Sequence, residues 1–275
     1  MRRYVAALCF ICVAAASQGH AASKTEIKYF ILAGTMEPLM IMEPGNPMAG
    51  GMFTEIVKRV FQDSPYVVEP MVMPWQRMTV ELKKRKDWIM HGIPAFFEPD
   101  IPYRLSNIPV FPFNHIAVTL RDKPLKIRTA QDLFDRTVIL VENYHYPGLD
   151  LHLDKPLIGK GGGKIKSIRA FKPQGTLRML KHRRGDAVIG FQPRLLYHLQ
   201  AADLKFDDVR FQDASAIVPT QPMYIAFSPK LPGSFEMFVN ERLEALRSRG
   251  EITEILERYY GPIGVPRFAG AERKN

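Results

Sequence analysis

The clearest pattern of apolar and polar positions in this chain begins at Val67. Residues Val67–Met73 are rich in β-branched side chains and methionine, and they end at Pro74, which is typical of a strand whose tip stops pairing. In the run Met78–Arg85, apolar residues fall on one side and charged residues on the other, which predicts a helix that lies on a sheet. The apolar side of this helix consists of Met78, Val80 and Leu82, with Trp88 following.

A short apolar run comes after this predicted helix. Trp88–Met90 is expected to be a central parallel strand that is buried on both faces. His91 and Gly92 would then stand at its carboxyl end, where open α/β sheets bind their ligands. The order of strand, helix, buried strand and loop therefore predicts an α/β fold with a small-molecule cleft at a sheet edge.

This order and spacing resemble the periplasmic solute-binding proteins of bacterial family 3, whose best-known members bind polar amino acids. In this resemblance Trp75 takes the place of an aromatic residue after the strand-ending Pro74. Asp87 takes the acidic place before the next strand. Arg104 takes the place of the arginine that clamps a ligand carboxylate, although the segment Ile93–Tyr103 before it is several residues longer than the family's loop.

The resemblance covers most of the chain and implies its architecture. Matching segments are Gly34–Leu39, Gly50–Val57, Thr129–Leu133 with the strand Thr137–Val141, Leu180–Ile189 and Phe235–Tyr260. The implied fold is a type II periplasmic-binding-protein fold with two lobes, each a mostly parallel sheet flanked by helices. Residues 23–117 and 223–275 would form lobe 1, and residues 118–222 would form lobe 2. Two hinge crossings, near His115–Leu120 and Pro219–Ala226, would join the lobes.

The first 22 residues have the three parts of a secretory signal peptide. Arg2 and Arg3 precede the apolar run Tyr4–Ala16, and small residues follow at Gly19–Ala22. A retained membrane anchor is the alternative, but the apolar run is shorter than the roughly 20 residues that span a bilayer. We therefore expect residues 1–22 to be cleaved and the mature protein to be periplasmic. Both cysteines lie inside this segment, so their C-x-x-C spacing carries no metal or redox meaning in the mature chain.

Composition and motifs exclude several classes of function. The net charge of +10 would fall to +8 on loss of Arg2 and Arg3, but the basic residues are spread along the chain, which does not indicate a nucleic-acid partner. The histidines show no i, i+4 pair, so a zinc site is not predicted. The segment Gly159–Lys164 lacks the Ser or Thr of a phosphate-binding loop and is expected to be a surface turn. No Gly-x-Ser-x-Gly elbow is present, and no cofactor is expected.

The segments that resemble lobe 2 depart from the amino-acid binders. Where those proteins hold the ligand carboxylate on a Gly-Thr turn, this chain has Asn143–Gly148. Where they place an aspartate for the ligand ammonium, it has Gly190–Gln192. A buried ammonium without that acid would be unpaired. We therefore expect an anionic or neutral ligand with a flat or apolar part rather than an ordinary amino acid.

The predicted ligand-binding residues combine these positions. Trp75 would stack on the ligand, although it could equally be a core tryptophan. Arg104 would hold an anionic group through its fork of donors, or else be a surface arginine. The full predicted set is Met36, Glu37, Trp75, His91, Gly92, Arg104, Tyr144, His145, Phe191 and Gln192.

Three functions are compatible with the sequence. The first is a monomeric solute-binding protein that captures a small molecule by lobe closure and delivers it to an ABC-type permease. The second is a sensor or partner protein on the same scaffold, which would report to a membrane receptor. The third is an enzyme such as the cyclohexadienyl dehydratases among the relatives, with Glu37 or His145 as general acid or base. No paired carboxylates support that third function, so we do not predict an enzyme.

Overall fold

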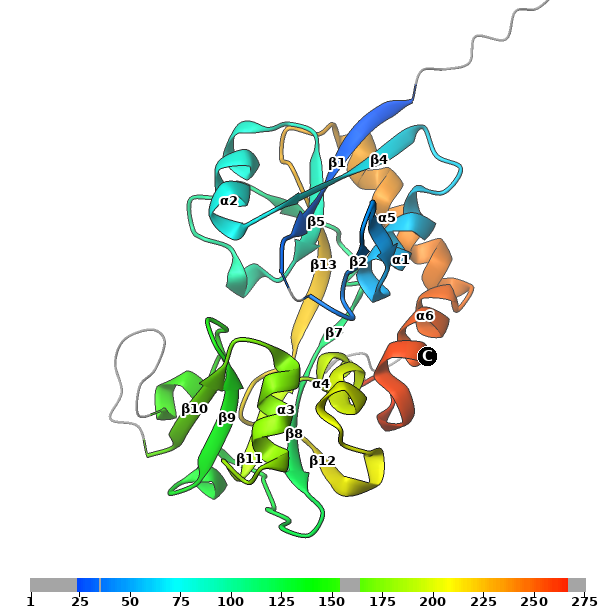
Figure 1. The fold of residues 1–275 in the computed structure, drawn as a ribbon. Coiled ribbons are helices and arrows are strands. Elements are labelled where there is room, and N and C mark those ends of the chain that lie inside the picture. The colour runs from blue at the N-terminus through cyan, green and yellow to red at the C-terminus, as the bar shows by residue number, and fades with distance from the viewer. Residues whose placement is uncertain (1–23, 35, 154–163, 267–275) are drawn as a thin grey trace, which may run out of the picture.

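The computed structural model describes residues 24–34, 36–153 and 164–266, which form two lobes that each contain one large sheet (Figure 1). The predicted signal peptide, residues 1–22, lies outside the described residues, as do residues 159–163 of the glycine-rich segment. None of the helices in the described ranges is long and apolar enough to cross a membrane.

The sheet of the first lobe has strands from both halves of the chain. Its order is β4 (Tyr66–Met73), β1 (Thr25–Leu32), β5 (Trp88–Gly92), β13 (Gln221–Phe227) and β6 (Arg104–Leu105), and β7 (Phe111–Phe113) pairs with another part of β13. The strands predicted at Val67–Met73 and Trp88–Met90 are both confirmed, as β4 and β5. One difference concerns the direction of the neighbours of β5. The strand β5 is parallel to β1 but antiparallel to β13, which returns from the second lobe to pair with it.

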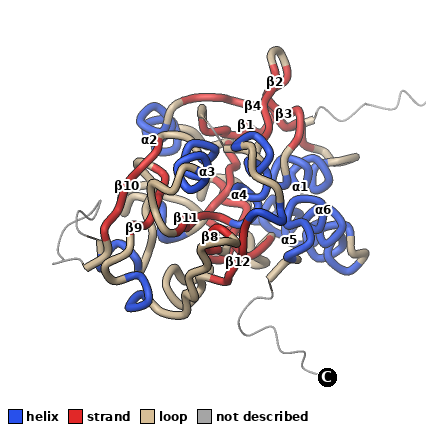
Figure 2. Tube along the Cα trace, turned by 60° about the horizontal axis from the view of Figure 1, so that its bottom comes forward, coloured by secondary structure: helices blue, strands red, loops and turns tan. Residues whose placement is uncertain are grey.

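Helices cover both faces of this first sheet. Helices α1 (Met52–Phe61), α5 (Gly233–Ser248) and α6 (Glu251–Tyr260) gather on one side, and α2 (Trp75–Lys84) lies on the other (Figure 2). On α2, Met78 and Leu82 are buried against a cluster that contains Trp88, as predicted. Val80 is 44% exposed instead, because residues two positions apart on a helix do not share a face.

A short hairpin and a glycine connect β1 to α1. The hairpin strands are β2 (Ile41–Glu43) and β3 (Asn46–Gly50), and the chain then turns at Gly51 with a φ of 99°. A Cβ atom on Gly51 would lie 2.7 Å from the carbonyl oxygen of Leu39. Glycine is therefore required here, both by the backbone conformation and by the close approach of the loop that follows β1.

The sheet of the second lobe is parallel on one side and antiparallel on the other. Its order is β10 (Lys166–Ala170), β9 (Thr137–Val141), β11 (Ala187–Phe191), β8 (His115–Leu120) and β12 (Val209–Asp213). Helices α3 (Pro173–Lys181) and α4 (Gln192–Leu199) pack on one face of it. Short 3-10 helices complete the chain at Pro94–Phe96, Ala130–Leu133, Leu149–His152, Gln200–Ala202, Phe206–Asp208 and Gly261–Ile263. The strand predicted at Thr137–Val141 is confirmed.

The chain passes between the sheets at two places, which differ from the predicted crossings. Asn114 alone separates β7 in the first sheet from β8 in the second, and residues 214–220 lead back from β12 to β13. The predicted boundary after residue 117 falls inside β8, whose residues from His115 onward pair within the second sheet. The predicted return at 219–226 is largely β13. Strands β7 and β8 are both fully buried, so the hydrophobic pattern does not mark the change of sheet.

Candidate functional site

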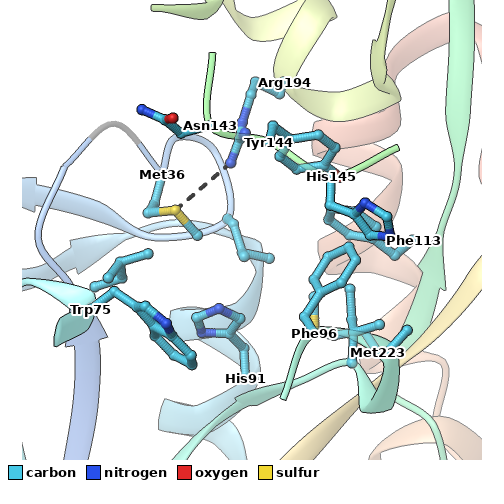
Figure 3. Close-up of a pocket in the computed structure, with 14 residues that line it drawn as sticks. Met36, Trp75, His91, Phe96, Phe113, Asn143, Tyr144, His145, Arg194 and Met223 are labelled. Carbon is cyan, nitrogen blue, oxygen red and sulfur yellow. Dashed lines mark hydrogen bonds between the residues drawn. The ribbon is translucent and has the colours of Figure 1, made fainter. Parts of the chain in front are cut away.

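A cavity of about 360 Å³ lies between the two lobes, where the carboxyl ends of several parallel strands meet (Figure 3). Residues of both lobes line it, and most of them are apolar or aromatic. They are Leu32, Met36, Leu39, Trp75, His91, Ile93, Ala95, Phe96, Phe113, Asn143, Tyr144, His145, Arg194 and Met223. The volume lies in the lower part of the range of about 300–1,000 Å³ that is usual for small-molecule sites.

Strand ends position the residues of the first lobe. Trp75 is the first residue of α2 because Pro74 stops β4 and then serves as the N-cap of that helix. Its indole Nε1 donates a hydrogen bond to Glu98 at 3.2 Å, and its ring lines the cavity. His91 stands near the end of β5, as predicted, and lies next to Trp75 on the side of the cavity opposite Arg194 (Figure 3).

The loop after β9 supplies the facing residues of the second lobe. Asn143 has a φ of 55°, a left-handed conformation that asparagine tolerates better than most residues, and the chain turns there. The hydroxyl of Tyr144 lies 2.9 Å from Nε2 of His115. Nδ1 of His145 lies 2.6 Å from the buried carboxylate of Asp150. Both cavity side chains therefore lie against polar groups of the second lobe.

Arg194 contributes a buried cation to the cavity. It comes from the first turn of α4, directly after β11, and is only 8% exposed. Nη2 of its guanidinium lies 3.8 Å from the sulfur of Met36, and its Nε is buried without a hydrogen-bond partner in the described part of the chain. Burial lowers the pKa of Arg194, but guanidinium groups remain protonated in proteins. An unpaired buried charge costs on the order of several kcal/mol, so an anion in this cavity would be stabilised.

The histidines near Arg194 are neutral at pH 7. Burial, with a smaller contribution from the charge of Arg194, lowers the pKa of His91 to about 4 and that of His115 to about 3. The same causes lower the pKa of His198 to about 4. These imidazoles can donate or accept hydrogen bonds at neutral pH, but they add no positive charge beside Arg194.

The structure brings five of the predicted site residues together and separates the other five from the cavity. Those that line it are Met36, Trp75, His91, Tyr144 and His145. Those that do not are Glu37, Gly92, Arg104, Phe191 and Gln192. Glu37 follows the lining residue Met36, and one of its carboxylate oxygens is buried without a hydrogen-bond partner in the described residues.

Arg104 does not point to the cavity, so its predicted role as a ligand clamp needs correction. It lies on β6 at the far side of β13, where its Nη1 donates to Glu236 at 2.9 Å and its Nη2 donates to the carbonyl of Leu231. Its guanidinium carbon also lies 5.2 Å from the centre of the Phe227 ring. The long segment before Arg104 carries the chain past β13, and an acidic residue of α5 then neutralises the arginine.

Gly92 and Phe191 have structural contacts instead of a place in the cavity. A Cβ atom on Gly92 would lie 2.7 Å from that of Ala226, so the glycine allows β5 and β13 to pair closely. The ring of Phe191 stacks on Phe113 with a centroid distance of 4.1 Å and meets Tyr260 edge to face. Phe191 thus joins the two lobes behind the cavity.

Gln192 is part of a buried hydrogen-bond network next to the first crossing. Its Oε1 accepts from the amide of Asn114 at 2.8 Å. Its Nε2 donates to the carbonyl of Tyr260 at 3.2 Å and to that of Gly264 at 2.9 Å. These bonds use both amide hydrogens and the carbonyl oxygen, so Gln192 connects the lobes, and it does not line the cavity that contains Arg194.

The sequence analysis missed Arg194, the most polar group of the cavity, and the apolar residues Phe96, Phe113 and Met223. A weak signal for Arg194 was present. Pro193 favours the start of a helix directly after the late strand, and this places residue 194 in the first helical turn at a strand's carboxyl end. Among the described residues, no group of three or more His, Cys, Asp or Glu side chains is arranged to hold a metal ion.

No protein-family model matches the chain, and no curated protein matches it either. Solved structures do. The chain is similar to the probable amino-acid ABC transporter extracellular-binding protein YtmK from Bacillus subtilis, with a TM-score of 0.67 and 15% identity over 87% of this chain and 99% of that one. A structure from Streptococcus mutans, described with glutathione import through GshT and the cystine ABC importer TcyBC, has a TM-score of 0.65 and 19% identity over 89% of this chain and 98% of that one.

A histidine kinase sensor domain with similarity to periplasmic binding proteins is also similar, with a TM-score of 0.61 and 16% identity over 87% of this chain and 97% of that one. At these identities the comparisons establish the fold. The chain has the two-lobed periplasmic-binding-protein fold, as the sequence predicted.

Proposed function

We propose that this protein is a periplasmic solute-binding protein, which captures a small organic ligand between its lobes and delivers it to an ABC-type permease. The observation that carries the proposal is the cavity between the lobes, which has aromatic walls and contains the buried Arg194. Similarity to binding proteins of ABC transporters supports the same function. The predicted cleavable signal peptide, residues 1–22, would account for export to the periplasm.

The composition of the cavity supports an anionic ligand or one with an aromatic part. Trp75, Phe96, Phe113 and Tyr144 offer ring surfaces, and aromatic groups stack well on such surfaces. Arg194 offers a fork of donors that suits an anion. His91, neutral at pH 7, offers a further hydrogen bond next to Trp75.

The two connections between the lobes support a closing motion around the ligand. Two crossings join the sheets, one at Asn114 and one at residues 214–220, and hinge closure around a ligand commonly uses a few such residues. Closure about these crossings would bring Trp75 and Arg194, which belong to different lobes, onto opposite sides of one ligand. Both crossings would act as hinges, and the first lobe would comprise the segments before and after them.

Binding accounts for the cavity better than catalysis does. None of its lining residues is a carboxylate, so the paired acids of a dehydratase-like mechanism are lacking among the described residues. His145, one of the two candidate bases, lines the cavity beside Asp150, but no acid faces it from the other lining residues. Glu37, the other, does not line the cavity.

A sensor protein is the second candidate function. The similarity to a histidine kinase sensor domain favours it, because the same scaffold there belongs to a signalling protein. In that case the ligand-bound form would contact a membrane receptor instead of a permease. The cavity and its ligand would be the same in both functions, so the partner distinguishes them.

A thermal-shift screen of the mature protein tests the proposal. Amino acids, organic acids, aromatic acids, phosphates and small sugars would be tested, because a ligand that binds only the folded state raises the melting temperature. We expect a clear shift with one class, confirmed by titration calorimetry. If no class shifts the melting temperature, the solute-binding function is wrong, and so is a sensor that needs the same ligand. If one class binds, capture of the partner of the ligand-bound protein from membranes distinguishes a permease from a receptor.

A further inference from the structure

Arg194 is the only lysine or arginine among the described residues that line the cavity, and its surroundings restrict the charge of a ligand. Its guanidinium makes no ion pair in the described part of the chain, and its one hydrogen-bond contact there is with the sulfur of Met36. The planar fork of an arginine matches the two oxygens of a carboxylate. A carboxylate that binds here would form an ion pair with Arg194, which is only 8% exposed.

The rest of the lining supplies no free partner for a second charge. It contains no carboxylate and no other lysine or arginine, burial keeps His91 neutral, and His145 already lies 2.6 Å from the carboxylate of Asp150. A ligand ammonium would therefore be buried without an acid, and a second carboxylate would be buried without a cation. Both would weaken binding relative to a ligand that carries one negative charge.

Glu37 is an acidic side chain near Arg194. It lies close enough for its charge to raise the pKa of Arg194, yet it forms no ion pair with the guanidinium and does not line the cavity. Its buried oxygen has no hydrogen-bond partner in the described residues. If Glu37 turned toward the cavity it would serve an ammonium group, so an amino-acid ligand is the alternative that the experiment must separate.

We infer that the ligand is a monocarboxylate with a flat apolar body and no amino group, and that Arg194 binds its carboxylate while the aromatic walls hold its body. This inference rests on the proposed function and narrows it. Two features of the cavity carry it: the cation comes from the second lobe, and no carboxylate accompanies it among the lining residues.

Matched ligands test the inference on the unaltered protein. Binding of 3-phenylpropionate is compared by calorimetry with that of phenylalanine, which adds an ammonium, of benzylmalonate, which adds a second carboxylate, and of 3-phenylpropanamide, which removes the charge. Benzoate, phenylacetate, cinnamate and indole-3-acetate cover other sizes of the flat body. We expect at least one monocarboxylate to bind. Its counterparts with an added ammonium, an added carboxylate or an amide should bind at least about tenfold more weakly, because each leaves a buried charge unpaired.

Two arginine variants connect the binding to Arg194. Arg194→Met, which keeps an unbranched apolar stem and removes the charge, should weaken binding of the best monocarboxylate about 30-fold or more, because it leaves the carboxylate without its partner. Arg104→Met is the matched control, since Arg104 is paired with Glu236 outside the cavity, and it should leave the affinity unchanged. Circular dichroism establishes that each variant is folded.

The outcomes separate the inference from the proposed function. The inference is overturned if phenylalanine or benzylmalonate binds as tightly as 3-phenylpropionate, if Arg194→Met binds the monocarboxylate as the unaltered protein does, or if no monocarboxylate binds while another class of the wider screen does. In the last case the solute-binding function stands with a different ligand. Only the absence of binding by every class would remove the proposed function as well.

Discussion

Replacing Gln192 by leucine should destabilise the folded protein strongly, because this side chain connects the two lobes. Leucine has a similar volume but no polar atoms, so Gln192→Leu removes the hydrogen bonds to Asn114, Tyr260 and Gly264 without opening a large cavity. At about 1 kcal/mol for each of these hydrogen bonds, the free energy of unfolding should fall by about 3 kcal/mol. For a protein of this size that corresponds to a decrease of about 6–12 °C in melting temperature.

Urea unfolding followed by circular dichroism measures this change. Gln200→Leu is a suitable control, because Gln200 lies at the other end of the same helix and is exposed, so its replacement should change the free energy of unfolding by less than about 0.5 kcal/mol. The reasoning is refuted if Gln192→Leu is as stable as this control. A stable variant that has lost ligand binding would restore Gln192 to the site that the sequence alone predicted.

Two further predictions concern the folded state. Gly51→Ala should lower the free energy of unfolding by about 2 kcal/mol or more, because Gly51 has a φ of 99° and a Cβ atom there would meet the Leu39 carbonyl. Thermal unfolding should find no such loss in the control Gly233→Ala, where the space around the Cβ position is open. Stability should also fall as the pH is lowered from 7 to 5, since the folded-state pKa values of His91 and His115, about 4 and about 3, lie below the ordinary 6.5, and the unfolded chain therefore takes up protons first. The free energy of unfolding should fall by on the order of 1–2 kcal/mol per histidine. His115→Gln should make this fall smaller when urea unfolding is compared at pH 7 and pH 5. If the pH dependence is unchanged in His115→Gln, or if the exposed His182→Gln reduces it equally, the buried histidines are not its cause.

The sequence predicted elements well where a local pattern determines them. The strand before Pro74, the helix after it and the strand Thr137–Val141 each have their own periodicity or boundary residue, and each is present. The crossings were placed a few residues too late because β7 and β8 are both buried along their whole length and only Asn114 lies between them. Sheet membership depends on pairing with distant strands, and hydrophobicity does not encode that pairing.

The site shows the same limit. Trp75 and His91 could be predicted because each follows a recognisable strand end. Arg104 could not be assigned from sequence, since its position depends on pairing with β13 and on Glu236, which lies more than a hundred residues away. Arg194 was missed for a related reason: what distinguishes it from the other basic residues is its burial without an acidic partner, and burial is a property of the assembled lobes.

The path of the chain also predicts an order in which the two lobes fold. The second lobe's sheet is built from one continuous stretch, residues 115–213, so it can form once that stretch is free. The first lobe needs β13 beside β5, and its core includes Phe235, Leu243 and Leu256 from the last helices. Its N-terminal strands must therefore wait, with their apolar faces uncovered, until nearly the whole chain is available to fold. In an exported protein, as proposed above, this means that nearly the whole chain must first cross the membrane. We expect chaperones that hold exported chains to matter most for this segment.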